Sequence, residues 1–202
     1  MRRVIRLLAM LALLVLGATT SCTQGAGEEW DDLMQEAASL YGKGQYDQAV
    51  TGAKKALEIA EENAGPYHPD VARSLNVMAL AYHAEGQYAR AESLYGRSLA
   101  VFEMALGPDH PEVATSLNNL ARFWSGQGRY AEAEPLYERS LAIVEAALGP
   151  DHPTVATSLN NLAALHDAQG RYAEAEPLYE RSLAIVEAAL GPDHPTVATS
   201  LN

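Results

Sequence analysis

An Asp-His pair recurs in this 202-residue sequence, as Asp109 with His110, Asp151 with His152, and Asp193 with His194. A carboxylate beside an imidazole could ligate a metal ion or transfer a proton. Each pair, however, lies in a Gly-Pro-Asp-His-Pro segment just before a stretch of helical periodicity, where such side chains cap helices. One carboxylate and one imidazole per loop make a poor metal site, and whole helical hairpins separate successive loops. We therefore interpret the pairs as helix caps and expect no metal and no cofactor.

Other residues that could do chemistry have simpler explanations. His166 falls on an apolar helical stripe where Trp124 stands in a neighbouring copy, so we expect a packed, half-buried side chain. Acids such as Glu132, Glu134 and Glu138 are expected on solvated helix faces. The phosphate-binding, dinucleotide-binding, zinc-protease and nucleophile-elbow motifs are all missing from the sequence. We expect no catalytic residues and a protein that is not an enzyme.

The composition favours helices and an acidic surface. Apolar residues make up 48% of the sequence, mainly Ala and Leu, which are strong helix formers. The formal net charge is −12, which works against binding nucleic acid or an anionic lipid surface. Cys22 is the single cysteine, so no internal disulfide forms.

The residues are organised by a repeat. The 32 residues 129–160 return without a change at 171–202, 42 residues later. A looser copy begins at Gln87, and a fainter one begins at Gln45. A fixed period of this size is typical of a solenoid, in which each unit contacts only its neighbours. The sequence therefore predicts an all-α, right-handed superhelix of stacked helical hairpins.

Each repeat unit reads as two amphipathic helices. After Pro153 a first apolar stripe runs to His166, and Gly170 then favours a turn. A second stripe follows from Tyr172, and Gly191 closes it. We place the starts of the second helices at about Ala131 and Ala173, despite a proline one turn later. The predicted units are 30–66, 70–108, 112–150 and 154–192, with a partial fifth repeat at 196–202.

These residues carry a family resemblance. The pattern Leu-x-x-Leu-Ala, Gly-x-Tyr-x-x-Ala and Tyr-x-x-Ser resembles the tetratricopeptide repeat. The 42-residue period and the LNNLA segments at 117–121 and 159–163 are similar to the variant in kinesin light chains and their bacterial relatives. In the first copy Glu36 stands where Leu162 stands later, which suits an end repeat facing solvent.

The resemblance implies that the first helix of each unit lines a concave groove. Asparagines recur on that helix, and in kinesin-type repeats they contact the cargo peptide, so we expect Asn76, Asn118 and Asn160 to bind the backbone of an extended peptide. The variable groove positions should set specificity: Arg73, Thr115, Thr157, Arg122, His83, Ser125 and Asp167. The partner is expected to be a protein or peptide and not nucleic acid. The groove contains no lysine and only these two arginines, which argues against a basic clamp for acidic C-terminal peptides.

Residues 1–22 form a targeting segment. Three arginines precede an apolar run at 7–16, which is too short to span a bilayer but suits a signal-peptide core. Small residues then lead to Cys22, an arrangement that resembles a bacterial lipoprotein signal with lipidation at this cysteine. Thr19 departs from that signal, since an aliphatic residue is usual there, and an ordinary secretory signal is the alternative. Residues 23–29 then read as a flexible tether, and the resemblance implies anchoring on the periplasmic side of the outer membrane.

The sequence stops at Asn202, inside the next copy of the first helix. We expect the sequence to be a fragment of a longer array. It leaves three functions open: a docking scaffold, the recognition part of a larger protein with an effector domain beyond residue 202, or a self-assembling array.

Overall fold

The computed structural model describes residues 27–191, and this part of the chain contains helices and no strand. The helices follow one another as 27–42, α2 (Tyr46–Ala64), α3 (Pro69–Ala84), α4 (Tyr88–Leu106), α5 (Pro111–Ser125), α6 (Tyr130–Leu148), α7 (Pro153–Ala168) and α8 (Tyr172–Leu190). They form four hairpins, each of which corresponds to one predicted unit. The prediction of an all-α repeat solenoid is confirmed.

The two predicted ends of the array fall partly outside these residues. The signal segment 1–22, residues 23–26 of the tether and the partial fifth repeat at 196–202 lie outside the described residues. Residues 27–29, which we assigned to the tether, belong to the 27–42 helix. Acidic residues at 28 and 29 in its first turn suit the positive end of the helix dipole, which explains the earlier start.

A histidine cap and a proline begin the first helix of each later hairpin. The Nδ1 atoms of His68, His110 and His152 accept hydrogen bonds from backbone N–H groups two residues on, at 3.1–3.3 Å. The following proline has no N–H to leave unsatisfied at this position. The interpretation as helix caps is therefore confirmed for the Asp-His pairs at 109–110 and 151–152, with His as the capping residue, and the pair at 193–194 lies outside the described residues.

The second helix of each hairpin begins one residue earlier than we placed it. α6 begins at Tyr130 and α8 at Tyr172. Each start lies two residues after a glycine with positive φ, which is Gly128 for α6 and Gly170 for α8. Pro135 lies inside α6, but it is exposed, so water can take the place of the backbone hydrogen bond that the ring removes.

A buried serine ties the two helices of a hairpin together. The Oγ atoms of Ser98, Ser140 and Ser182 donate to the carbonyls of Ala72, Ala114 and Ala156 at 2.8–2.9 Å. The serines and alanines are buried, so the helices approach closely at these small residues. This contact recurs in the three later units, whereas the first unit has Ala56 at the position of the serine.

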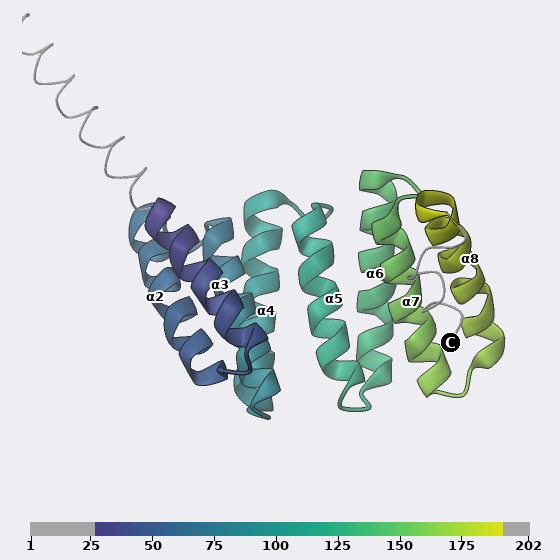
Figure 1. The fold of residues 1–202 in the computed structure, drawn as a ribbon, viewed down its shortest axis with the longest axis horizontal. Coiled ribbons are helices and arrows are strands. Elements are labelled where there is room, and N and C mark those ends of the chain that lie inside the picture. The colour runs from purple at the N-terminus through teal and green to yellow at the C-terminus, as the bar shows by residue number, and fades with distance from the viewer. Residues whose placement is uncertain (1–26, 192–202) are drawn as a thin grey trace, which may run out of the picture.

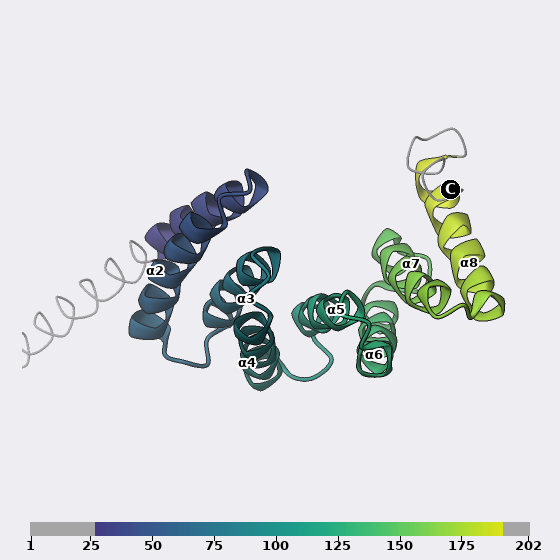
Figure 2. The same cartoon turned by 90° about the horizontal axis from the view of Figure 1, so that it is seen from below.

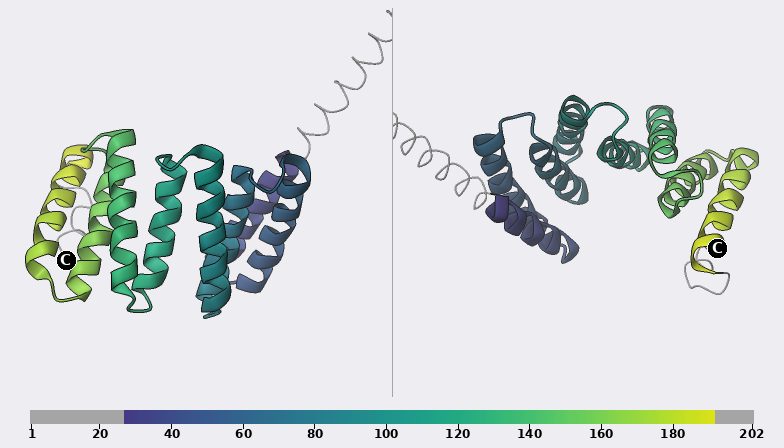
Figure 3. Two further views of the ribbon diagram at one scale, coloured as in Figure 1. Left: turned by 180° about the vertical axis from the view of Figure 1, so that it is seen from behind. Right: turned by 90° about the horizontal axis from the view of Figure 1, so that it is seen from above.

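Stacking of the hairpins gives a curved array (Figure 1). Seen from below, the 27–42 helix, α3, α5 and α7 lie on the inner side of the curve, and α2, α4, α6 and α8 lie on the outer side (Figure 2). The same order of hairpins appears from behind and from above (Figure 3). Val71, Leu75 and their equivalents in α5 and α7 are buried between the layers and form a continuous core. None of the helices described here is both long and apolar enough to cross a membrane.

Candidate functional site

The concave face is formed by the inner helices α3, α5 and α7. Residues on each of them that do not belong to the core repeat in four rows: Arg73, Thr115 and Thr157; Asn76, Asn118 and Asn160; Leu80, Arg122 and Ala164; His83, Ser125 and Asp167. Each row is one helical turn from the next, because the positions of successive rows on one helix are three or four residues apart. All twelve side chains are exposed or half-buried. The structure therefore brings the predicted groove residues together on one surface.

The asparagines on this surface have a second role, which is to join adjacent repeats. Asn119 donates through Nδ2 to Oδ1 of Asn76 at 3.3 Å, and Asn161 donates to Oδ1 of Asn118 at 2.8 Å. Each bond uses one acceptor site of the Asn76 or Asn118 Oδ1 atom, and neither Nδ2 group donates to another residue within 27–191. The asparagine row therefore retains hydrogen-bond donors, which suit the carbonyl oxygens of an extended peptide.

Arg73 is engaged within the array. Its guanidinium contacts Asp70 at 2.7 Å on its own helix and Glu112 on α5 at 3.1 Å. Burial lowers the pKa of Arg73, but the hydrogen bonds and charges of Glu112 and Asp70 together outweigh burial and raise that pKa above its ordinary value. The side chain thus joins two repeats and has less freedom to meet a ligand than Arg122, which occupies the third row.

An aromatic cluster lies beneath His83 at the junction of α3, α4 and α5. The ring of Phe123 is fully buried and stands 5.1 Å from the His83 ring, nearly perpendicular to it. The ring centroids of Tyr95 and Tyr88 lie 5.5 and 6.3 Å from that of Phe123. Burial, and then the positive charge of Arg122, lowers the pKa of His83 below its ordinary value. This end of the concave face therefore presents a neutral imidazole at neutral pH.

The Tetratricopeptide repeat family model matches residues 33–104, 75–123, 125–188 and 168–202. Together these matches take in nearly all of the array. The chain belongs to the tetratricopeptide repeat family.

Solved tetratricopeptide-repeat structures resemble the array closely. A putative kinesin light chain of Podosopora anserina with nearly identical repeats is 29% identical, with a TM-score of 0.72 over 84% of this chain and 81% of that one. BtubC (BKLC) from P. vanneervenii is 26% identical, with a TM-score of 0.71 over 82% of this chain and 66% of that one, just under two thirds of its length. The Rap protein complexed with competence and sporulation factor, at 18% identity and a TM-score of 0.70, shares the fold over 85% of this chain and 51% of its own. No curated protein sequence matches significantly.

The junctions between tetratricopeptide repeats contain ion pairs that the sequence analysis missed. Glu134 on α6 accepts from Arg171 at 2.8 Å and lies 3.1 Å from Nε2 of His166, both in the next repeat. The prediction of a solvated Glu134 is wrong, because stacking brings a buried ring and a guanidinium onto its carboxylate. His166 is buried rather than half-buried. The signal that could have found this pairing is the recurrence at a spacing of 42 residues of Glu92 and Glu134 together with Arg129 and Arg171.

The Glu132 side chain is 43% exposed, as expected, and it also accepts a hydrogen bond at 3.1 Å from Arg129, one turn before it. Glu138 is exposed, as expected.

On the outer helices a second series of ion pairs joins successive repeats. Arg139 pairs with Glu103, and Arg181 pairs with Glu145, each at 2.6 Å. Exposed pairs of this kind contribute only about 0–1 kcal/mol each, so they set register more than stability.

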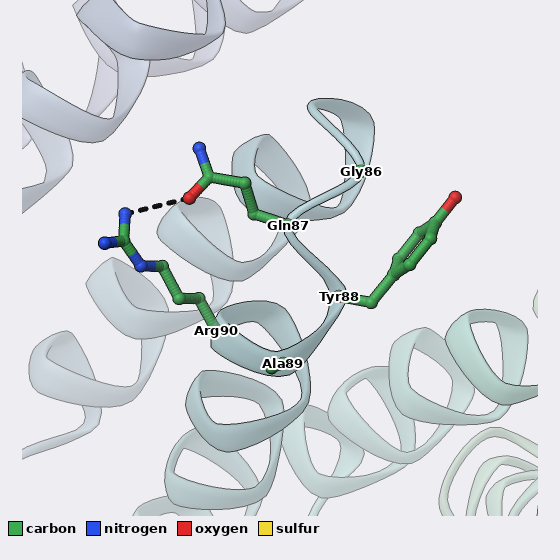
Figure 4. Close-up of a pocket in the computed structure, with 5 residues that line it drawn as sticks. All are labelled: Gly86, Gln87, Tyr88, Ala89 and Arg90. Carbon is green, nitrogen blue, oxygen red and sulfur yellow. Dashed lines mark hydrogen bonds between the residues drawn. The ribbon is translucent and has the colours of Figure 1, made fainter.

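An open pocket of about 490 Å³ lies at the turn between α3 and α4. Gly86, Gln87, Tyr88, Ala89 and Arg90 line it, and Arg90 donates to the Gln87 side-chain oxygen at 2.8 Å (Figure 4). Tyr88 points away from this pair (Figure 4). These five residues supply neither a nucleophile nor an acid–base pair, so the pocket gives no support to a catalytic role.

Proposed function

We propose that the array is a non-enzymatic scaffold whose concave face binds an extended peptide or an extended segment of a partner protein. The observation that carries the proposal is the row of asparagine donors on the inner helices, held in register by the bonds between repeats. Tetratricopeptide arrays commonly act as protein-interaction scaffolds, and the structurally similar Rap protein is crystallised in complex with competence and sporulation factor. A curved stack with an ordered inner face supplies a long surface of this kind without any moving part.

Removing the Asn160 side chain tests this function most cleanly. Within residues 27–191 its amide makes no side-chain hydrogen bond to the rest of the array, so Asn160→Ala leaves the bonds between repeats intact. We expect Asn160→Ala to bind peptides selected from a random nonapeptide display library about two- to tenfold more weakly. The double variant Asn118→Ala/Asn160→Ala, which also breaks the bond from Asn161, should lose a further factor of about that size. The helicity measured by circular dichroism should not change.

The matched control is Asn161→Ala. It breaks the bond to Asn118 but leaves both peptide-facing amides in place, so peptide affinity should stay close to that of the wild type while the melting temperature falls. Equal loss of affinity in both variants would show that the asparagines act only in stacking. Selection of no peptide by the folded wild-type array would refute the proposed function itself.

We also propose that the protein is exported in a bacterium and anchored by a lipid on Cys22, with a soluble secreted or periplasmic protein as the alternative. The support is the basic, apolar and small-residue order of residues 1–22 and the position of the cysteine at its end. Anchoring would leave the concave face free to bind partners at the envelope.

Metabolic labelling with a radioactive fatty acid tests the anchor. Cells that express the wild type should incorporate label into the protein, and cells that express Cys22→Ser should not. Equal labelling of the two would place the lipid elsewhere, and no labelling of either would favour an ordinary secretory signal.

A second candidate function is that the array is the partner-binding part of a larger protein. The array spans 66% of the BtubC chain, and an effector domain beyond residue 202 would make the concave face its targeting or regulatory part. Reading the gene past codon 202 separates the two functions, because an appended catalytic domain would replace the scaffold-only view.

A further inference from the structure

Arg122 differs from the other arginines in the described part of the chain. It is exposed on α5 in the middle of the concave face, and within residues 27–191 no carboxylate or side-chain amide pairs with its guanidinium. The others are all engaged by such groups: Arg73, Arg90, Arg97, Arg129, Arg139, Arg171 and Arg181. Its neighbours in the same row are Leu80 and Ala164, which are neutral. Arg122 is thus a single available cation on an otherwise uncharged row.

Asp167 is its counterpart on the next repeat. It is exposed on α7, and within the same described residues it forms no ion pair with a lysine, arginine or histidine. It belongs to the fourth row, where His83 and Ser125 stand in the preceding repeats. The carboxylate raises the pKa of the nearby Tyr179, after the larger effect of burial. Of α3, α5 and α7, the adjacent helices α5 and α7 therefore carry one available charge of each sign.

The distance between the backbone positions of Arg122 and Asp167 limits which peptide can contact both side chains. α5 and α7 are close enough for a direct bond between Asn118 and Asn161, so their axes are about 8–10 Å apart. Asp167 lies three residues beyond Ala164, the equivalent of Arg122, which adds about 4.5 Å along the helix. The two positions are thus roughly 10 Å apart, and an extended chain advances about 3.3 Å per residue. About three residues of peptide span the gap.

We propose that the concave face selects an extended peptide with one acidic and one basic side chain about three residues apart, the acid on Arg122 and the base on Asp167. This inference rests on the proposed peptide-binding function and names its ligand class. The overall negative charge of the chain disfavours polyanionic segments, so a lone acid near a base fits better than an acidic run. The order of the two charges in the peptide reports the direction in which it binds.

Panning a random nonapeptide display library on the immobilised array tests the inference. The wild type should enrich peptides with an acid and a base at a separation of about three residues, in one order. Arg122→Gln should lose only the preference for the acidic residue and keep that for the basic one. Asp167→Asn should lose only the preference for the basic residue. A peptide selected on the wild type should bind each variant about two- to fivefold more weakly, as expected for exposed ion pairs.

Lys55→Gln is the matched control, because it removes an exposed cation from α2, on the outer side of the curve and away from the concave face. It should leave the charge preference unchanged. Enriched peptides without paired charges, or an unchanged preference in Arg122→Gln, would overturn the inference while leaving peptide binding in place. Enrichment of no peptide at all by the folded array would overturn both.

Discussion

Tyr137→Ala is expected to lower the free energy of unfolding by about 3–5 kcal/mol, the usual cost of truncating a buried aromatic side chain. Tyr137 is 3% exposed and packs with Ala121, Leu162 and Leu165, so it contacts both its own repeat and the next. Burial also raises its pKa to about 12. Urea unfolding followed by circular dichroism measures the loss, and ultraviolet titration of the phenol checks the burial.

Tyr179→Ala is the matched control for this prediction. Residues 171–191 repeat residues 129–149 letter for letter, so Tyr179 has the same local sequence as Tyr137. Its side chain is half-buried, because α8 is the last described helix of the stack. We expect its truncation to cost clearly less, about 1–2 kcal/mol, in proportion to the smaller area removed from contact. Equal losses would mean that α8 is covered in solution as fully as α6.

Phe123→Ala is expected to have an effect of similar size, about 3–5 kcal/mol. The ring is fully buried and lies within 5.1–6.3 Å of the rings of His83, Tyr95 and Tyr88, so truncation leaves a cavity among three aromatic side chains. Phe123→Leu is the conservative control, since Leu165 fills the equivalent position one repeat later and is buried there. We expect the leucine variant to lose much less stability.

Phe123→Ala should also change how the stability of the protein depends on pH. Burial is the larger cause of the lowered pKa of His83, so its folded pKa lies below the ordinary 6.5. The unfolded chain then binds a proton before the folded chain does, and stability falls as the pH drops through the range of the unfolded value. Opening the cavity at Phe123 should return the pKa of His83 toward 6.5 and weaken this part of the acid sensitivity. Titration of the His83 ring protons by NMR measures the shift, and an unchanged pKa would contradict the assigned cause.

The local features of this chain were predictable because they depend on near neighbours in sequence. Apolar periodicity, the glycines at 170 and 191 and the Gly-Pro-Asp-His-Pro segments fix where helices begin and end, since caps and turns act over a few residues. The exact 42-residue period then implies stacking, because a lone hairpin cannot bury both of its stripes. The fold class follows from these facts, whereas the placing of the first helix of each unit on the concave side came from the resemblance to the tetratricopeptide repeat.

What only the tertiary structure decided is which polar groups are available. Glu134 was expected in solvent, yet it holds His166 and Arg171 of the next repeat, and Asn118 accepts a bond from Asn161. Arg73 and Arg122 are alike in sequence terms, but the first is paired across a junction and the second is free among residues 27–191. Such pairings join residues about 30 to 45 positions apart, and their geometry depends on the angle at which hairpins stack. A repeat pattern determines which residues share a face, whereas hydrogen-bond partners are determined only once the faces are packed together.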